Sequence, residues 1–157
     1  MPKPLAFAVL ALVALLSYAG SATAAEEFKF TTTLTALNPV TGTITGDTDA
    51  TGKAEFTILP EEGLICYEIE VEGTTEPTEP APGLGSAHIH VLPSGGIAVD
   101  LESEFTLDEV GDEFKASGCV EVDSELIEAI LANPEAYYVN IHTVEFPGGA
   151  LSGRLSG

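Results

Sequence analysis

The sequence predicts an all-β protein, an antiparallel Greek-key-like β-sandwich with one short helix near residues 124–132. Three observations favour this fold. Short segments alternate apolar and polar side chains, turn residues such as Gly, Pro and Asn separate these segments, and a single stretch has helical spacing. Because alternation with a period of two buries one face of each strand, we expect two sheets to pack these faces together.

The strands are expected in chain order between short turns. Residues 28–34 alternate Phe and Leu with Lys and Thr, which indicates a half-buried strand. Residues 52–58 and 64–71 flank a turn at 60–63, so we expect an antiparallel hairpin. Residues 73–85 contain three prolines without periodicity and indicate an exposed loop. Further strands are expected at residues 87–91, 97–101, 114–122, 137–143 and 150–155.

The helix is predicted between residues 124 and 132. Leu126, Ile127 and Ile130 recur there at helical spacing. Asp123 precedes them as a suitable N-cap residue, because a carboxylate can accept hydrogen bonds from the free amide groups of the first turn. Pro134 cannot continue a helix and therefore limits its length.

The N-terminal 25 residues predict a cleavable secretory signal peptide. Lys3 precedes an uninterrupted apolar run over residues 5–16, and small residues including Ala22 and Ala24 form a cleavage region. This run is shorter than the roughly 20 apolar residues that span a bilayer. We therefore expect residues 26–157 to form one exported domain, secreted or periplasmic, without a membrane span after signal cleavage.

The composition is strongly acidic and limits the classes of partner. The chain carries 25 Asp and Glu against 5 Lys and Arg, a formal net charge of −20 at pH 7. Because nucleic acids are bound through Lys and Arg, this charge excludes nucleic-acid binding. The acidic residues are spread along the chain, as expected of a solvated surface that keeps an exported protein soluble.

The two cysteines are expected to form a disulfide. Cys66 shares a strand face with Glu68, and Cys119 shares one with Glu121, so both thiols point away from the apolar faces. Two outward thiols suit a bridge across neighbouring strands in an exported protein, where disulfides persist. Two thiolate ligands of a metal ion are the alternative, although the chain has no Cys-x-x-Cys pair.

All three histidines lie in two strand-like segments. His88 and His90 project from one face of the first segment, and Asn140 and His142 project together from the second. If the two strands lie close together, the imidazoles converge. Three imidazole nitrogens can bind copper or zinc, and Asn140 is a candidate for a hydrogen bond that orients the rings.

A purely structural role for the same side chains is the alternative. The histidines would then hydrogen-bond to one another, to Asn140 and to backbone groups, and would close one end of the sandwich. The matching faces and the lack of any other histidine leave the two interpretations evenly balanced.

Several motifs together resemble the chordin-type domain, known as CHRD. They are Ala-His-Ile-His at residues 87–90, Val-Asn-Ile-His-Thr at 139–143, Pro-Gly-Gly at 147–149 and Gly-Arg-Leu at 153–155. The resemblance covers roughly residues 28–155. CHRD domains occur in the morphogen antagonist chordin and in single-domain exported prokaryotic proteins. The resemblance therefore implies a fold and an exported location, and it brings no established reaction with it.

The sequence is compatible with three functions, of which the first is the most expected and the third the least. We expect the first, a non-enzymatic exported protein that binds another protein, a surface polymer or a metal ion. The sequence identifies no definite cofactor for it. The second is a module whose three histidines hold copper or zinc for storage, delivery or defence against toxic metal. The third is a redox enzyme of the dismutase type, because the His-x-His strand is similar to the copper-binding strand of copper–zinc superoxide dismutase. That enzyme needs more histidines than the three in this chain.

Overall fold

The computed structural model describes residues 25–108, 111 and 113–156, so the predicted signal peptide lies outside the described residues except for its last residue. The helices are α1 (Ser124–Ala132) and the 3₁₀ turn η1 (Pro134–Ala136). The strands are β1 (Phe28–Leu34), β2 (Leu37–Asn38), β3 (Thr43–Ile44), β4 (Thr51–Leu59), β5 (Leu64–Glu72), β6 (Ala87–Val91), β7 (Gly96–Asp100), β8 (Thr106–Leu107), β9 (Glu113–Glu121), β10 (Tyr137–Ile141) and β11 (Leu151–Arg154).

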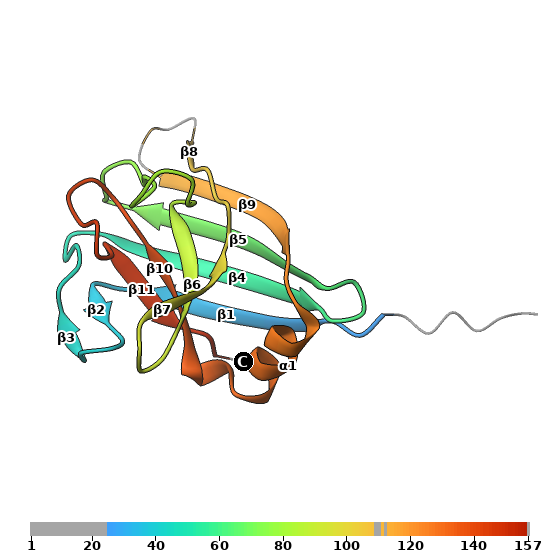
Figure 1. Cartoon of the computed structure of the whole chain (residues 1–157). Coiled ribbons are helices and arrows are strands. Elements are labelled where there is room, and N and C mark those ends of the chain that lie inside the picture. Colours follow the sequence, from blue (N-terminus) through green and yellow to red (C-terminus); the bar gives the residue numbers. More distant parts are fainter. Residues whose placement is uncertain (1–24, 109–110, 112, 157) are drawn as a thin grey trace, which may run out of the picture.

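The strands form the predicted antiparallel β-sandwich (Figure 1). One sheet, sheet A, has the strand order β1-β4-β5-β9-β8, and the other, sheet B, has the order β11-β10-β6-β7. The predicted hairpin is present as β4 and β5, paired over nine residues. A backbone bridge between Thr35 and Ser152 links the ends of the two sheets next to β1 and β11, and the two-residue strands β2 and β3 form a separate small hairpin.

The core lies between the two sheets and follows the alternation of the sequence. On β5, Ile65 and Ile69 are buried while Glu68 between them is exposed. From sheet B, Ile89 and Val139 enter the same core. Each such side chain contributes about 1.5–3 kcal/mol by leaving water, so this packing fixes which face of every strand is turned inward.

Helix α1 has the predicted bounds and closes one end of the sandwich (Figure 1). Its buried residues Ile127 and Ile130 are part of the core. Asp123 occupies the N-cap position, but its side chain makes no capping hydrogen bond. Its backbone carbonyl instead accepts hydrogen bonds from the amides of Leu126 and Ile127, 3.0 Å each.

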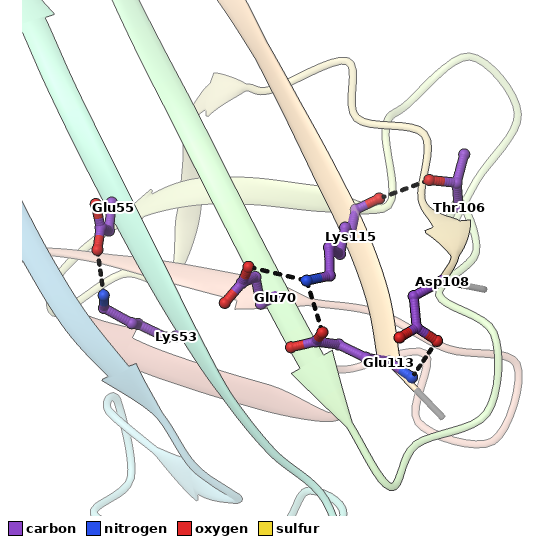
Figure 2. Close-up of polar contacts among 7 residues, drawn as sticks. All are labelled: Lys53, Glu55, Glu70, Thr106, Asp108, Glu113 and Lys115. Atoms are coloured by element: carbon purple, nitrogen blue, oxygen red, sulfur yellow. Dashed lines mark hydrogen bonds and ion pairs between the residues drawn. The ribbon is translucent and has the colours of Figure 1, made fainter. Parts of the chain in front are cut away.

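The outer face of sheet A carries the disulfide and several ion pairs. Cys66 and Cys119 are directly opposite each other on β5 and β9 and are joined as predicted. Four residues further along the same two strands, the Lys115 ammonium lies 3.2 Å from Glu70 and 2.7 Å from Glu113 (Figure 2). Exposed pairs of this kind each contribute less than about 1 kcal/mol, so the disulfide is the stronger cross-link on this face.

Within the described ranges, no helix is both long enough and apolar enough to cross a membrane.

Candidate metal centre

The histidines lie on the face of sheet B that is turned away from the core. On β6, Ile89 enters the core, so its neighbours His88 and His90 project from the opposite face. Asn140 pairs with His88 across β10 and β6. His142 lies two residues beyond Asn140, just after β10, where its backbone amide donates a hydrogen bond to the carbonyl of Ser86.

The fold brings the three imidazoles together. One ring nitrogen from each of His88, His90 and His142 lies within 4.8 Å of the others. The ring centroids of His88 and His142 are 5.0 Å apart, and those of His88 and His90 are 5.6 Å apart. The residues are 0%, 7% and 5% exposed in sequence order, so the cluster is buried although it lies outside the main core.

Backbone carbonyls determine the tautomers of two of these rings. His90 Nδ1 lies 2.9 Å from the carbonyl oxygen of Gly95, and His142 Nδ1 lies 2.9 Å from that of Pro147. Since a carbonyl oxygen can only accept, each Nδ1 carries the proton and each Nε2 carries a lone pair. Neither Nε2 has a hydrogen-bond partner among the described residues, although both are buried. This is the arrangement in which protein histidines bind metals through Nε2.

His88 differs from the other two histidines because neither of its ring nitrogens has a hydrogen-bond partner in the described part of the chain. Its Nε2 lies 3.7 Å from Asp100 Oδ1, which is an electrostatic contact and longer than a hydrogen bond. Leaving a buried polar atom without a partner costs about 1–3 kcal/mol. A ligand that accepted the lone pairs of these buried nitrogens would remove this free-energy cost.

Burial lowers the pKa of all three imidazoles. For His142, burial and the neighbouring His88 lower the pKa to about 4. For His88, the lowering by burial is partly opposed by Asp100. The three rings are therefore neutral near pH 7, and neutral imidazole is the form that binds a metal ion.

Asn140 does not contact the histidines through a hydrogen bond but holds the loop beside them. Its amide Nδ2 donates to the carbonyl of Gly148, 3.2 Å away. The preceding carbonyl, of Pro147, accepts the hydrogen bond from His142. Asn140 thus orients a ring indirectly, through the loop that carries the acceptor.

The three histidines and Asn140 were identified from the sequence, whereas four other contributors were missed. Tyr138 stacks on His90 with ring centroids 5.1 Å apart and planes 15° apart. The carbonyls of Gly95 and Pro147 are backbone groups, which residue types do not reveal. Asp100 could have been noticed as the one acidic residue in the apolar segment 97–101, in the strand that follows the His88 strand.

Three buried neutral imidazoles are a donor set that suits copper or zinc. Nitrogens bound to one such ion at about 2.0–2.1 Å lie roughly 3.3 Å apart, so the three ring nitrogens, which lie within 4.8 Å of one another, would have to move closer together to share it. All three histidines of the chain are in this cluster, so a second, imidazole-bridged metal has no histidine left to bind it.

The comparisons with known proteins agree with the motifs. No curated protein matches the chain. The family model of the CHRD domain matches residues 30–155, which is most of the chain, and the CHRD family is not known as a family of enzymes. A disulfide and a CHRD domain both fit an extracellular domain. The chain belongs to the CHRD domain family.

Proposed function

We propose that this protein is an exported, non-enzymatic CHRD-domain protein whose three histidines bind one copper or zinc ion. The observation that carries the proposal is the set of buried Nε2 atoms of His90 and His142, which lack hydrogen-bond partners among the described residues while backbone carbonyls hold their Nδ1 atoms. His88 completes the set with a ring that no hydrogen bond occupies within the described residues.

Export is part of this proposal and has separate support. Residues 1–25 have the charge and hydropathy pattern expected of a signal peptide, and the Cys66–Cys119 disulfide is of the kind that persists outside the cytoplasm. An exported protein would meet the metal ions present outside the cytoplasm. Storage, delivery and protection from toxic metal are all compatible with a site of this composition.

The test is a calorimetric titration of the full chain with Zn²⁺ and with Cu²⁺ near pH 7. We expect one ion per chain, with Cu²⁺ bound more tightly than Zn²⁺, as the usual order of affinities for nitrogen ligands requires. His88→Leu removes one ligand and is expected to lower the affinity by more than about 100-fold. Because the imidazole it replaces has no hydrogen-bond partner among the described residues, the metal-free stability should change by less than about 1.5 kcal/mol.

Glu68→Gln is the matched control for this titration. Glu68 is an exposed carboxylate on the outer face of sheet A, and the variant tests whether loss of a single charged side chain away from the histidines changes the affinity. We expect its affinity to equal that of the wild type. Equal metal affinity of the wild type and His88→Leu would contradict the proposal. A large loss of metal-free stability in His88→Leu, without any metal binding by the wild type, would support the structural role.

A further inference from the structure

Asp100 lies beside His88 because of an irregularity in the pairing of β6 and β7. His90 pairs with Ile97, but the register shifts between Ile89 and His90, so that His88 pairs with Asp100. Without this shift, His88 would be opposite Val99, and Asp100 would project to the other face of the sheet. The bulge therefore places a carboxylate next to the most deeply buried of the three imidazoles.

The backbone around Asp100 is folded to hold one of its oxygens in place. Asp100 Oδ1 accepts hydrogen bonds from the amides of Gly85, at 3.0 Å, and Glu102, at 2.9 Å. A side chain at Gly85 would approach Asp100 Oδ1 to 2.9 Å and the amide nitrogen of Ser103 to 2.5 Å, so glycine is required there. Among the described residues, Glu102 is the one non-glycine residue with a positive φ, 49°. Such a backbone conformation costs free energy, so it persists only where contacts of the surrounding residues stabilise it.

The electrostatic effect of Asp100 on the His88 ring follows from its chemistry. An ionised carboxylate only accepts hydrogen bonds, so it repels a nitrogen lone pair and attracts an N–H group. His88 Nε2 is the ring atom that lies 3.7 Å from Asp100 Oδ1. The Nε2–H tautomer of the neutral His88 ring is therefore the more stable one, and its Nδ1 has a lone pair that can bind a ligand.

Asp100 is not positioned as a further ligand in this arrangement. The ligand atoms that lie within 4.8 Å of one another come from the three histidines and do not include the Asp100 carboxylate. A carboxylate behind a metal-binding imidazole commonly fixes its tautomer and raises its basicity.

We propose, on the basis of the metal site proposed above, that Asp100 is a positioning residue that fixes His88 as the Nε2–H tautomer. His88 then binds the metal through Nδ1, whereas His90 and His142 bind through Nε2. The site thus uses two kinds of orienting acceptor, a carboxylate for one ring and backbone carbonyls for the other two.

The test is nitrogen NMR of the histidine rings in the ¹⁵N-labelled full chain, before and after addition of Zn²⁺. In the metal-free protein we expect His88 with its proton on Nε2 and the other two rings with their protons on Nδ1. On zinc binding, the chemical shift of Nδ1 should move for His88, and that of Nε2 for His90 and His142. Single His→Asn variants assign the signals to the three residues.

Asp100→Asn tests the role of the carboxylate charge. An amide oxygen can still accept the hydrogen bonds from Gly85 and Glu102, so the backbone should be retained while the charge is lost. We expect the zinc affinity to fall by about 10–100-fold and the His88 signals to show both tautomers. Glu104→Gln is the control, because Glu104 lines the same surface hollow as Asp100 and its loss removes one charge too. That variant should keep the wild-type affinity and tautomers.

The outcomes separate this inference from the proposed function. If zinc binds and shifts His88 Nε2, or if Asp100→Asn binds zinc as tightly as the wild type, the positioning role is wrong and the metal site stands. If the wild type binds no zinc, the proposed function fails, and the His88 tautomer in the metal-free protein still decides the role of Asp100. An Nδ1–H tautomer of His88 there would overturn it. This measurement on the wild type also decides the question if Asp100→Asn does not fold.

Discussion

At the scale of single residues, the histidine cluster combines an energetic cost with a geometric gain. Buried nitrogens without partners among the described residues cost about 1–3 kcal/mol each in the metal-free protein. In return, the carbonyls of Gly95 and Pro147 fix two rings in the tautomer that presents Nε2. Rings that are oriented before binding lose little conformational freedom on binding, so this arrangement favours the proposed binding of an ion.

A substitution at Gly149 tests whether the loop beside His142 can adopt another conformation. It has a φ of 125°, and a Cβ atom there would lie 2.2 Å from Asn140 Oδ1. Gly149→Ala should therefore lower the free energy of unfolding by about 3 kcal/mol, because it strains the backbone and displaces Asn140. Metal affinity should fall too, since Asn140 holds the loop that orients His142. Urea denaturation and zinc titration measure the two effects.

Gly148→Ala is the matched control for this change. A Cβ atom at Gly148 would have no neighbouring atom within 4 Å, so its stability should stay within about 0.5 kcal/mol of the wild type. Equal stability of the two alanine variants would show that the loop adapts freely and that Asn140 does not define it.

The sequence predicted which site residues share a face of one strand, because that follows from side-chain alternation. It did not predict how the strands pair. Residues two apart on a strand share a face, so the pairing of His88 with His90 and of Asn140 with His142 was accessible. Whether the side chains of the two segments meet depends on how the two strands pair and in which register. Residue types do not specify that pairing. Asp100 stands out in the sequence as the one acidic residue of an apolar strand, but its place opposite His88 was inaccessible, because a bulge sets that pairing.

At the scale of elements, long periodic segments were predicted well and very short ones were not. The helix has the predicted bounds, and the hairpin of β4 and β5 lies where alternation and turn residues placed it. The two-residue strands β2, β3 and β8 are too short to show a period, so they were missed. The strand predicted over residues 137–143 ends at Ile141, and His142 after it lies against the loop whose Pro147 carbonyl contacts its Nδ1.

The disulfide links two elements of the sheet that does not carry the histidines. Cys66 and Cys119 are 53 residues apart in the sequence, and closing a loop of this length stabilises the fold by about 4 kcal/mol on the chain-entropy model. The double variant Cys66→Ala/Cys119→Ala should lose about this much free energy of unfolding. Its zinc affinity should be unchanged, because the cluster lies on sheet B. Denaturation and titration of the folded variant check both statements.

Wild-type protein treated with a reducing agent is the control for this variant. It should lose the same free energy of unfolding without any substitution. A folded double variant that no longer binds zinc would show that the two sheets are coupled and that the site is not built by sheet B and its loops alone.

At the scale of the whole molecule, charge favours cations near the protein. The formal net charge is −20, and the three lysines of the described residues each lie within 4.0 Å of a glutamate. Figure 2 shows two of these lysines on the outer face of sheet A. The 25 Asp and Glu outnumber the 5 Lys and Arg, so the surface has a negative potential, which attracts metal ions and repels anions. This potential raises the local concentration of cations, and in the proposed function the buried imidazoles would supply the specific ligands.

The most direct test of the metal site is X-ray diffraction from crystals of the zinc-loaded full chain, recorded on both sides of the zinc absorption edge. The proposal predicts one strong anomalous peak between His88, His90 and His142, with three nitrogens about 2.0–2.1 Å from it. A peak confined to surface carboxylates, with the three rings unchanged from the metal-free arrangement, would contradict the account and leave the histidines as part of the scaffold.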